Sequence, residues 1–179
     1  MLKYLAACAL MLPSMQPVAD DPPDCGLELH IAPDDLDLAN ERGALTAVLA
    51  NAGPRALRLV LPGDGSLDGW RTPRIEWQFT PTVDQVRLRC GNVNALRAGE
   101  VFTLQPGESR VLADWVTPDV MGEEYRARMV YANEPALAWH GLPLGRHDEA
   151  EMIRVGRTDR CRAVSNEITV RGQQPAGER

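Results

Sequence analysis

Apolar residues recur at every second position in several short segments of the chain, and turn-forming residues separate these segments. The clearest case is EEYRARMVYAN, in which apolar side chains alternate with Arg126 and Arg128. Because successive side chains of a β-strand point to opposite faces of its sheet, this pattern predicts a strand with one buried face. RIEWQF repeats it, with Ile75, Trp77 and Phe79 on the buried side.

The same alternation, bounded by Gly, Pro and Asn, predicts further strands along the chain. They cover 27–31, 45–49, 57–61, 85–90, 109–116 and a final strand over 162–172. In the final strand, Val164, Ile168 and Val170 are expected to face inward. Residues 92–107 are predicted to be loop, and 147–155 to form one or two helical turns. This pattern predicts an all-β fold of two antiparallel sheets that pack face to face.

The N-terminus has the layout of a cleavable secretory signal. Lys3 precedes an apolar stretch over 5–12 that is too short to span a bilayer, and small residues follow. The alternative, a buried N-terminal helix, is disfavoured because Pro13 and Pro17 would break it. We therefore predict a signal peptide over 1–19, and we expect the mature protein to be exported, to the bacterial periplasm or the extracellular space.

Beyond the signal, the pattern predicts a single domain. Residues 20–24 would be a short linker, 25–171 the β domain and 172–179 a flexible tail. A second possibility for the leader is LAAC, which resembles the bacterial lipobox and would place a lipid anchor on Cys8. No later segment is long and apolar enough to be predicted as a membrane span.

Composition limits the classes of partner. The formal net charge is −6, and 25% of the residues are charged. A mildly acidic chain with dispersed arginines lacks the basic face that duplex nucleic acid requires, so we expect no nucleic-acid partner. An unidentified protein or glycan is the expected partner.

Three cysteines, Cys25, Cys90 and Cys161, remain after the signal. No spacing among them resembles a zinc site, and in an oxidising compartment two of them are expected to pair. Cys25 opens the first strand and Cys161 precedes the last, and these strands run side by side in many sandwiches. Cys25–Cys161 is therefore the first choice, with Cys90–Cys161 as the alternative.

The segment PDVMGEEYRARMVY resembles the region of immunoglobulin-like and fibronectin-type domains in which an Asp and a Gly lead into a strand tyrosine. LANAG and SNEITV are similar to the second and last strands of bacterial secreted immunoglobulin-like domains. The resemblance implies an immunoglobulin-like sandwich in which Tyr125 is the corner tyrosine, bonding back to nearby backbone. The inter-sheet disulfide of antibody domains is absent, since the two corresponding strands carry no cysteines.

GDGSLDGW offers oxygen ligands in the spacing of a calcium loop, at Asp64, Ser66 and Asp68. Ile75 stands where such a loop needs a bidentate glutamate, so the strongest ligand is missing. The glycines equally suit a tight connection between two strands that needs positive φ. We interpret the segment as a turn, and we expect no metal and no cofactor.

The remaining candidate residues are a small set on loops. Trp70 and Trp139 could offer flat apolar surface to a ligand, with His140 beside the second, although loop tryptophans also cap sandwich ends. No serine lies in a nucleophile elbow, no cysteine–histidine spacing suggests a thiol nucleophile, and no phosphate loop is present. The expected function is binding or structure without catalysis. An accessory or inhibitor domain that binds a partner protein is the alternative, and a small metal-dependent hydrolase ranks below both.

Overall fold

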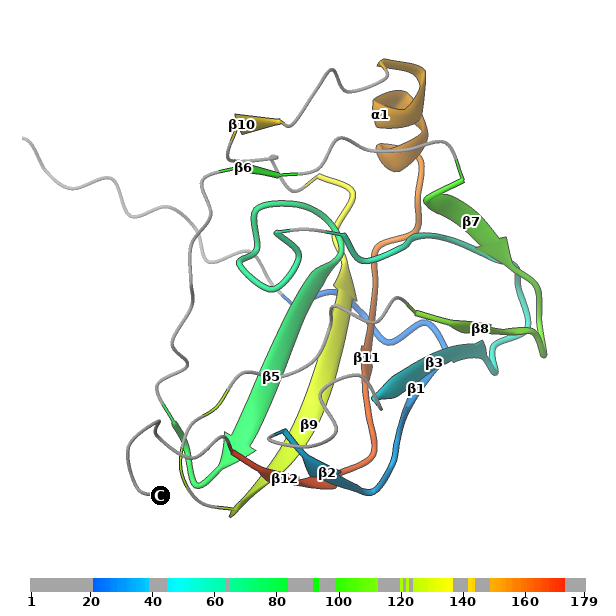
Figure 1. The fold of residues 1–179 in the computed structure, drawn as a ribbon. Helices are drawn as coiled ribbons and strands as arrows, with labels where there is room; N and C mark the ends of the chain where they lie inside the picture. The colour runs from blue at the N-terminus through cyan, green and yellow to red at the C-terminus, as the bar shows by residue number, and fades with distance from the viewer. Residues whose placement is uncertain are drawn as a thin grey trace, which may run out of the picture.

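The computed structural model describes residues 21–38, 45–63, 65–83, 92–93, 99–112, 120, 122, 124–136, 142–143 and 149–172. These residues form a mostly-β fold with one short helix (Figure 1). The strands are β1 Leu27–Ala32, β2 Asp35–Asp37, β3 Thr46–Asn51, β4 Leu57–Val60, β5 Arg74–Thr80, β6 Asn92–Val93, β7 Val101–Leu104, β8 Ser109–Val111, β9 Glu124–Asn133, β10 Leu142–Pro143, β11 Cys161–Val164 and β12 Ile168–Arg171. The helix, α1, spans Glu149–Val155, inside the predicted helical segment.

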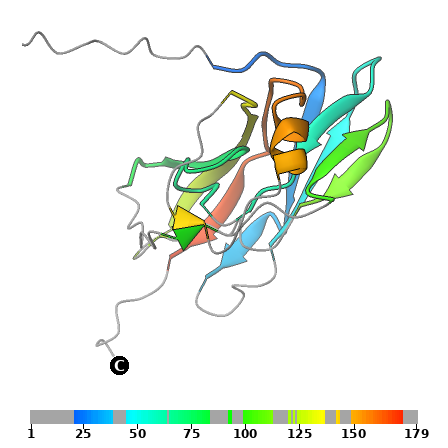
Figure 2. The same ribbon diagram turned by 90° about the horizontal axis from the view of Figure 1, so that it is seen from above.

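The larger sheet is built around β9. β5 pairs with β9 along one side, antiparallel over its whole length. β11 and β12 pair with β9 along the other side, both antiparallel, and β2 joins β12 in parallel. The second sheet consists of β1, β3 and β8, in that order and antiparallel. Figure 2 shows the two groups of strands side by side, and in Figure 1 α1 lies at the top, near one end of them.

The apolar positions of the alternating pattern form the core, as the sequence predicts. On β5, Ile75, Trp77 and Phe79 are buried, while Gln78 is exposed. One buried cluster combines side chains from both sheets, including Leu49 of β3. Burial of apolar surface on this scale is the main term that stabilises such a fold.

The predicted final strand contains a β-bulge. Cys161 pairs with Asn133 and Val164 with Val130, but Ile168 pairs with Ala127, so the register shifts by one residue between β11 and β12. A bulge inserts one extra residue and reverses the alternation of the faces. The prediction that Val164 faces inward is therefore wrong: its side chain is 38% exposed.

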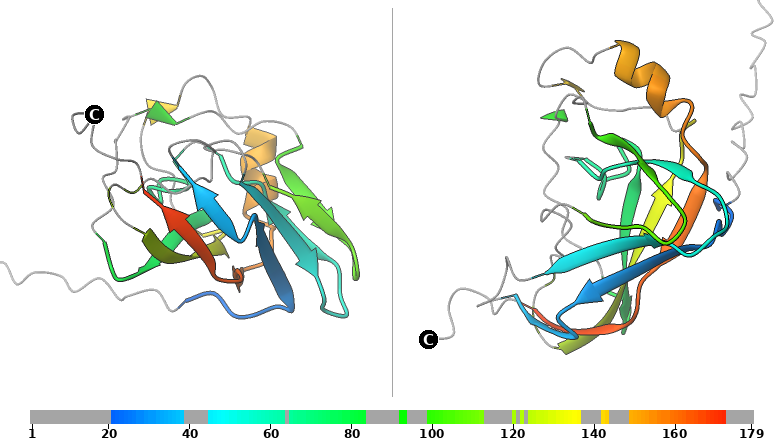
Figure 3. Two further views of the ribbon diagram at one scale, coloured as in Figure 1. Left: turned by 60° about the horizontal axis from the view of Figure 1, so that its bottom comes forward. Right: turned by 90° about the vertical axis from the view of Figure 1, so that its right-hand side faces the viewer.

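One further expectation changes. Residues 101–104, predicted to be loop, form β7, which pairs antiparallel with β4. β3 and β4 follow one another along the chain, as do β7 and β8, so the two pairs form one bent ribbon (Figure 3). The buried Asn51 holds the bend, because its side-chain amide donates to the carbonyl oxygens of Arg55 and Leu104.

Candidate functional site

The residues predicted to form a loop platform are only partly within the described structure. Trp139 and His140 lie outside the described residues, as do Asp64, Cys8 and Cys90. Trp70 is half-buried beside the turn over 65–69. A tryptophan-based ligand platform therefore stays a prediction.

Residues 65–69 form a turn, as predicted. Gly65 and Gly69 have φ of 88° and 68°, in the region that favours glycine. Ser66, one of the proposed calcium ligands, is buried, and its hydroxyl accepts a hydrogen bond from the Gly63 amide at 3.0 Å. Within the described residues, no three His, Cys, Asp or Glu side chains come together as metal ligands would.

Gly63 is required because there is no space for a side chain at this position. A Cβ placed on it would lie 2.1 Å from Nη1 of Arg71, so only glycine lets this side chain lie against the backbone. The Arg71 side chain is fully buried and its Nη2 donates to Glu100 at 2.9 Å. This ion pair fixes the turn to the residues just before β7.

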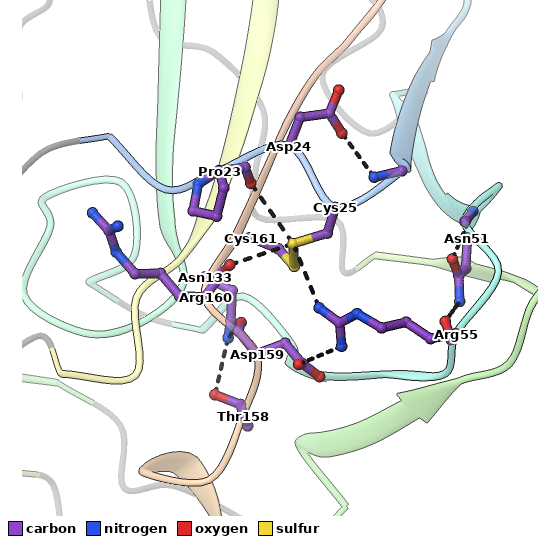
Figure 4. Close-up of a disulfide and its surroundings, with 12 residues drawn as sticks. Pro23, Asp24, Cys25, Asn51, Arg55, Asn133, Thr158, Asp159, Arg160 and Cys161 are labelled. Carbon is purple, nitrogen blue, oxygen red and sulfur yellow. Dashed lines mark hydrogen bonds and ion pairs between the residues drawn. A yellow bond between two sulfur atoms is a disulfide. The ribbon is translucent and has the colours of Figure 1, made fainter.

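The disulfide Cys25–Cys161 is present, with the two Cα atoms 5.6 Å apart, and the preferred pairing is confirmed. Its surroundings are drawn in Figure 4. The carbonyl oxygens of Pro23 and Arg160 lie 3.7 and 3.4 Å from Cys25 Sγ. Neither contact is a hydrogen bond, because a disulfide sulfur carries no hydrogen. The residues predicted as a linker also run beside β11, since the Arg162 amide donates to the Pro23 carbonyl.

Asp159 joins the disulfide region to β4. One carboxylate oxygen accepts from Arg55 Nη1 at 2.7 Å, and the other accepts from the Arg58 amide at 2.7 Å. The Arg55 guanidinium also lies 4.0 Å from Cys25 Sγ (Figure 4). Burial alone would raise the pKa of Asp159, but the hydrogen bonds from Arg58 and Arg55 and the charge of Arg55 together lower it below its usual value.

Buried polar side chains next to Asp159 satisfy the backbone groups of Val60 on β4. The Tyr131 hydroxyl donates to the Val60 carbonyl at 2.7 Å, and Asn133 Oδ1 accepts from the Val60 amide at 3.1 Å. Asn133 Nδ2 donates to Thr158 Oγ1 and to the Asp159 carbonyl. We call Tyr131, Asn133, Thr158 and Asp159 the β4 clamp.

The β4 clamp suits a structural role rather than proton transfer. Burial raises the pKa of the Tyr131 hydroxyl, so it stays protonated and donates. The Asn133 side-chain acceptor and both donors form hydrogen bonds within the protein, to Val60, Thr158 and Asp159. Groups held in this way fix the edge of β4 against β9 and the start of β11.

The lowered pKa of Asp159 predicts an acid-dependent loss of stability. A carboxyl whose folded-state pKa lies below its unfolded value of about 3.9 stabilises the protein above that value, and this contribution disappears as the pH falls through the folded pKa. The Asp159→Asn variant should therefore lose less stability than wild type between about pH 5 and pH 2. Urea unfolding across this range measures the difference, and parallel pH curves for both proteins would contradict the assignment.

Tyr125 lies at the start of β9, half-buried, with its ring in edge contact with Phe79 at a centroid distance of 6.0 Å. A Cβ placed on Gly122 would lie 3.6 Å from the Tyr125 hydroxyl, so the ring reaches back over the residues before the strand. The predicted bond from this hydroxyl to the backbone stays a prediction.

The bulge also arranges charges on the outer face of the larger sheet. Glu167 lies in the bulge and pairs with two arginines of β9, Arg126 at 3.0 Å and Arg128 at 3.5 Å. Gln78 and Thr80 of β5 complete a shallow hollow there. Both arginines share this one carboxylate, so the face is a self-paired polar surface.

The outer face of β1, β3 and β8 is more apolar. Val48 and Ala50 of β3 line a shallow groove there, together with Glu28 and His30 of β1 and Val164 of β11. Val111 of β8, directly opposite Val48, is 59% exposed. Exposed valines on a sheet face are candidates for contact with a partner.

Sequence reasoning missed the β4 clamp and Arg71. Asn133 ends a strand and precedes Glu134 and Pro135, so it has the sequence context of a turn residue. Arg71, between Trp70 and Thr72, resembles any solvated loop arginine. Their partners lie 73 and 29 residues away, and no local pattern carries that information.

Comparison of the chain with protein-family models, with curated proteins and with solved structures finds no match in any of the three. Within the described residues, no helix is long and apolar enough to span a membrane.

Proposed function

We propose that the chain is an exported, non-catalytic binding or structural module of the cell envelope or extracellular space, built as an immunoglobulin-like sandwich. The observation that carries the proposal is the Cys25–Cys161 disulfide, which joins the beginning of β1 to the beginning of β11. Disulfides of this kind form and persist in oxidising compartments. The signal-like segment over 1–19 agrees with that location.

The strand arrangement supports the sandwich. β1 pairs with β3 in one sheet, and the chain then crosses to the other sheet, where β2 runs parallel to β12. An N-terminal strand divided between two sheets, with its second half parallel to the last strand, is typical of immunoglobulin-like domains. We assign Tyr125, near the start of β9, as the corner tyrosine of such a domain.

Two kinds of partner fit such a module. A glycan would bind the loop end near Trp70, where Trp139 and His140 are also expected. A partner protein, the role of an accessory or inhibitor domain, would bind a sheet edge or face. The exposed Val111 favours the protein partner, because a glycan gains little from aliphatic side chains.

Recovery of the protein from its native host tests the location. Mass spectrometry should find an N-terminus near residue 20 and a Cys25–Cys161 disulfide in material from the envelope or the medium. A lipid on Cys8 would move the N-terminus and still agree with export. An intact Met1 together with reduced Cys25 and Cys161 in the cytosol would sink the proposal.

Binding is tested on the oxidised mature protein, against a glycan array and by cross-linking in envelope extracts. We expect saturable binding in the second experiment, to a partner that the reduced protein does not retain. Saturable binding to glycans alone would favour the loop end over the sheet.

A further inference from the structure

In the part of the chain that the structure describes, one edge of β8 is unpaired. Its ladder to β3 uses the Glu108 carbonyl, which accepts from the Asn51 amide at 3.0 Å, and the Leu112 amide, which donates to the Ala47 carbonyl at 2.7 Å. In an antiparallel pair, alternate residues bond to the same neighbour, so the backbone groups of Ser109 and Val111 point away from β3. Among the described strands, none pairs with β8 on that side.

The other strand edges near this face are capped by side chains. On β4, the backbone groups of Val60 bond to Tyr131 and Asn133, and the Arg58 amide bonds to Asp159. On β1, Asn166 accepts from the Ile31 amide and donates to the Ile31 carbonyl. Each cap supplies the bonds that a further strand would otherwise make.

β8 is only three residues long, which limits edge pairing, but its outward-facing residues Ser109 and Val111 are uncharged and neither is proline. Proteins commonly place charged residues, proline or a bulge on an exposed edge. β2 follows this rule, since it carries Asp35 and Asp37. The one charged residue of β8, Arg110, is half-buried and its guanidinium lies 4.5 Å from the Phe102 ring centroid, on the inner side.

We propose that the edge of β8 binds an extended strand of a partner protein, which would continue the β1–β3–β8 sheet. The inference rests on the proposed function and names the kind of partner for it. Ser109 and Val111 offer two amides and two carbonyls with the spacing of a strand, and only another strand satisfies all four in register. Val111 then contacts apolar side chains of that strand.

Charge favours a different protein over a second copy of this chain. The exposed acidic Glu108 adjoins the open edge, and Glu28 lies in the same cross-strand row as Ser109. The whole chain carries a net charge of −6, so two copies repel one another. The strand that fits best alternates apolar residues and carries a basic residue opposite Glu108.

The probe is a synthetic peptide that copies residues 45–51, the strand that β8 already pairs with, followed by an arginine. Its controls are the same peptide with alternate residues N-methylated, which blocks one backbone edge, and a peptide that ends in glutamate. Amide hydrogen exchange is followed in the oxidised mature protein. The amides of Ser109 and Val111 should exchange rapidly when free, and at least about tenfold more slowly with saturating arginine peptide.

Two variants separate the edge from the face. Val111→Pro removes a backbone donor that the fold does not use, so it should fold and lose the protection at Ser109. Val164→Lys changes the outer face beyond β1 and should leave that protection unchanged. Thermal unfolding verifies that both variants are folded. If Val111→Pro does not fold, Ser109→Pro replaces it as the edge variant.

The results divide clearly. Protection by the arginine peptide, abolished by N-methylation and by the proline variant, supports the edge. Protection that appears without peptide as the protein concentration rises, together with a dimer, would overturn the partner assignment in favour of a second copy. No protection at millimolar peptide overturns the inference. A native partner cross-linked equally to wild type and to Val111→Pro overturns it too, and leaves the proposed function standing.

Discussion

Replacing both Cys25 and Cys161 by serine is expected to lower the free energy of unfolding by about 2–5 kcal/mol. The two residues are 136 positions apart, so the bond closes a loop that contains most of the domain. In the chain-entropy account, a closed loop of this length restricts the unfolded chain by about 5 kcal/mol, and measured values are commonly smaller. For a domain of this size, the melting temperature should fall by about 5 to 15 °C.

Calorimetry with and without a reducing agent checks this prediction. Wild type under reducing conditions should match the double serine variant, because both lack the same bond. Cys90→Ser is the matched control, since it removes a thiol and leaves the disulfide able to form. If the reduced wild type melts within about 1 °C of the oxidised protein, which for a domain of this size corresponds to well under 1 kcal/mol, the bond does not stabilise the fold.

The disulfide was predictable because it depends only on strand order. An alternating pattern identifies the first and last strands, and the fold brings their beginnings together, as the bridge between Asp24 and Arg162 shows. The same pattern predicted β5 and β9 closely, since each carries a strict apolar face. The helical turns predicted over 147–155 correspond to α1.

The bulge in the last strand marks the limit of such reasoning. Ser165, Ile168 and Val170 are all buried, so the inward positions change from odd to even numbers within three residues. The cause is a set of long-range bonds: the Ser165 hydroxyl accepts from the Met129 amide, while Asn166 turns to Ile31 on β1. The alternation of apolar residues along a strand contains no information about these distant partners. It therefore predicted the wrong face for Val164.

Replacing Asn133 by alanine is expected to lower the free energy of unfolding by about 3–5 kcal/mol. The substitution leaves buried backbone groups that the β4 clamp satisfies without hydrogen-bond partners. The Val60 amide would lose its acceptor and the Asp159 carbonyl its donor, each at about 1–3 kcal/mol. Water cannot easily replace the side chain, since Asn133, Val60 and Tyr131 are fully buried.

Thr158→Val is the graded comparison for that loss. It removes one partner of Asn133 Nδ2 and keeps the bond to the Asp159 carbonyl, so we expect about 1–2 kcal/mol. Chemical denaturation of both variants measures the difference, and amide exchange at Val60 locates it. A cost below 1 kcal/mol for Asn133→Ala, with the Val60 amide still protected, would mean that β4 is held in place by its apolar contacts rather than by the clamp. That outcome would also weaken the contrast between the capped edge of β4 and the open edge of β8.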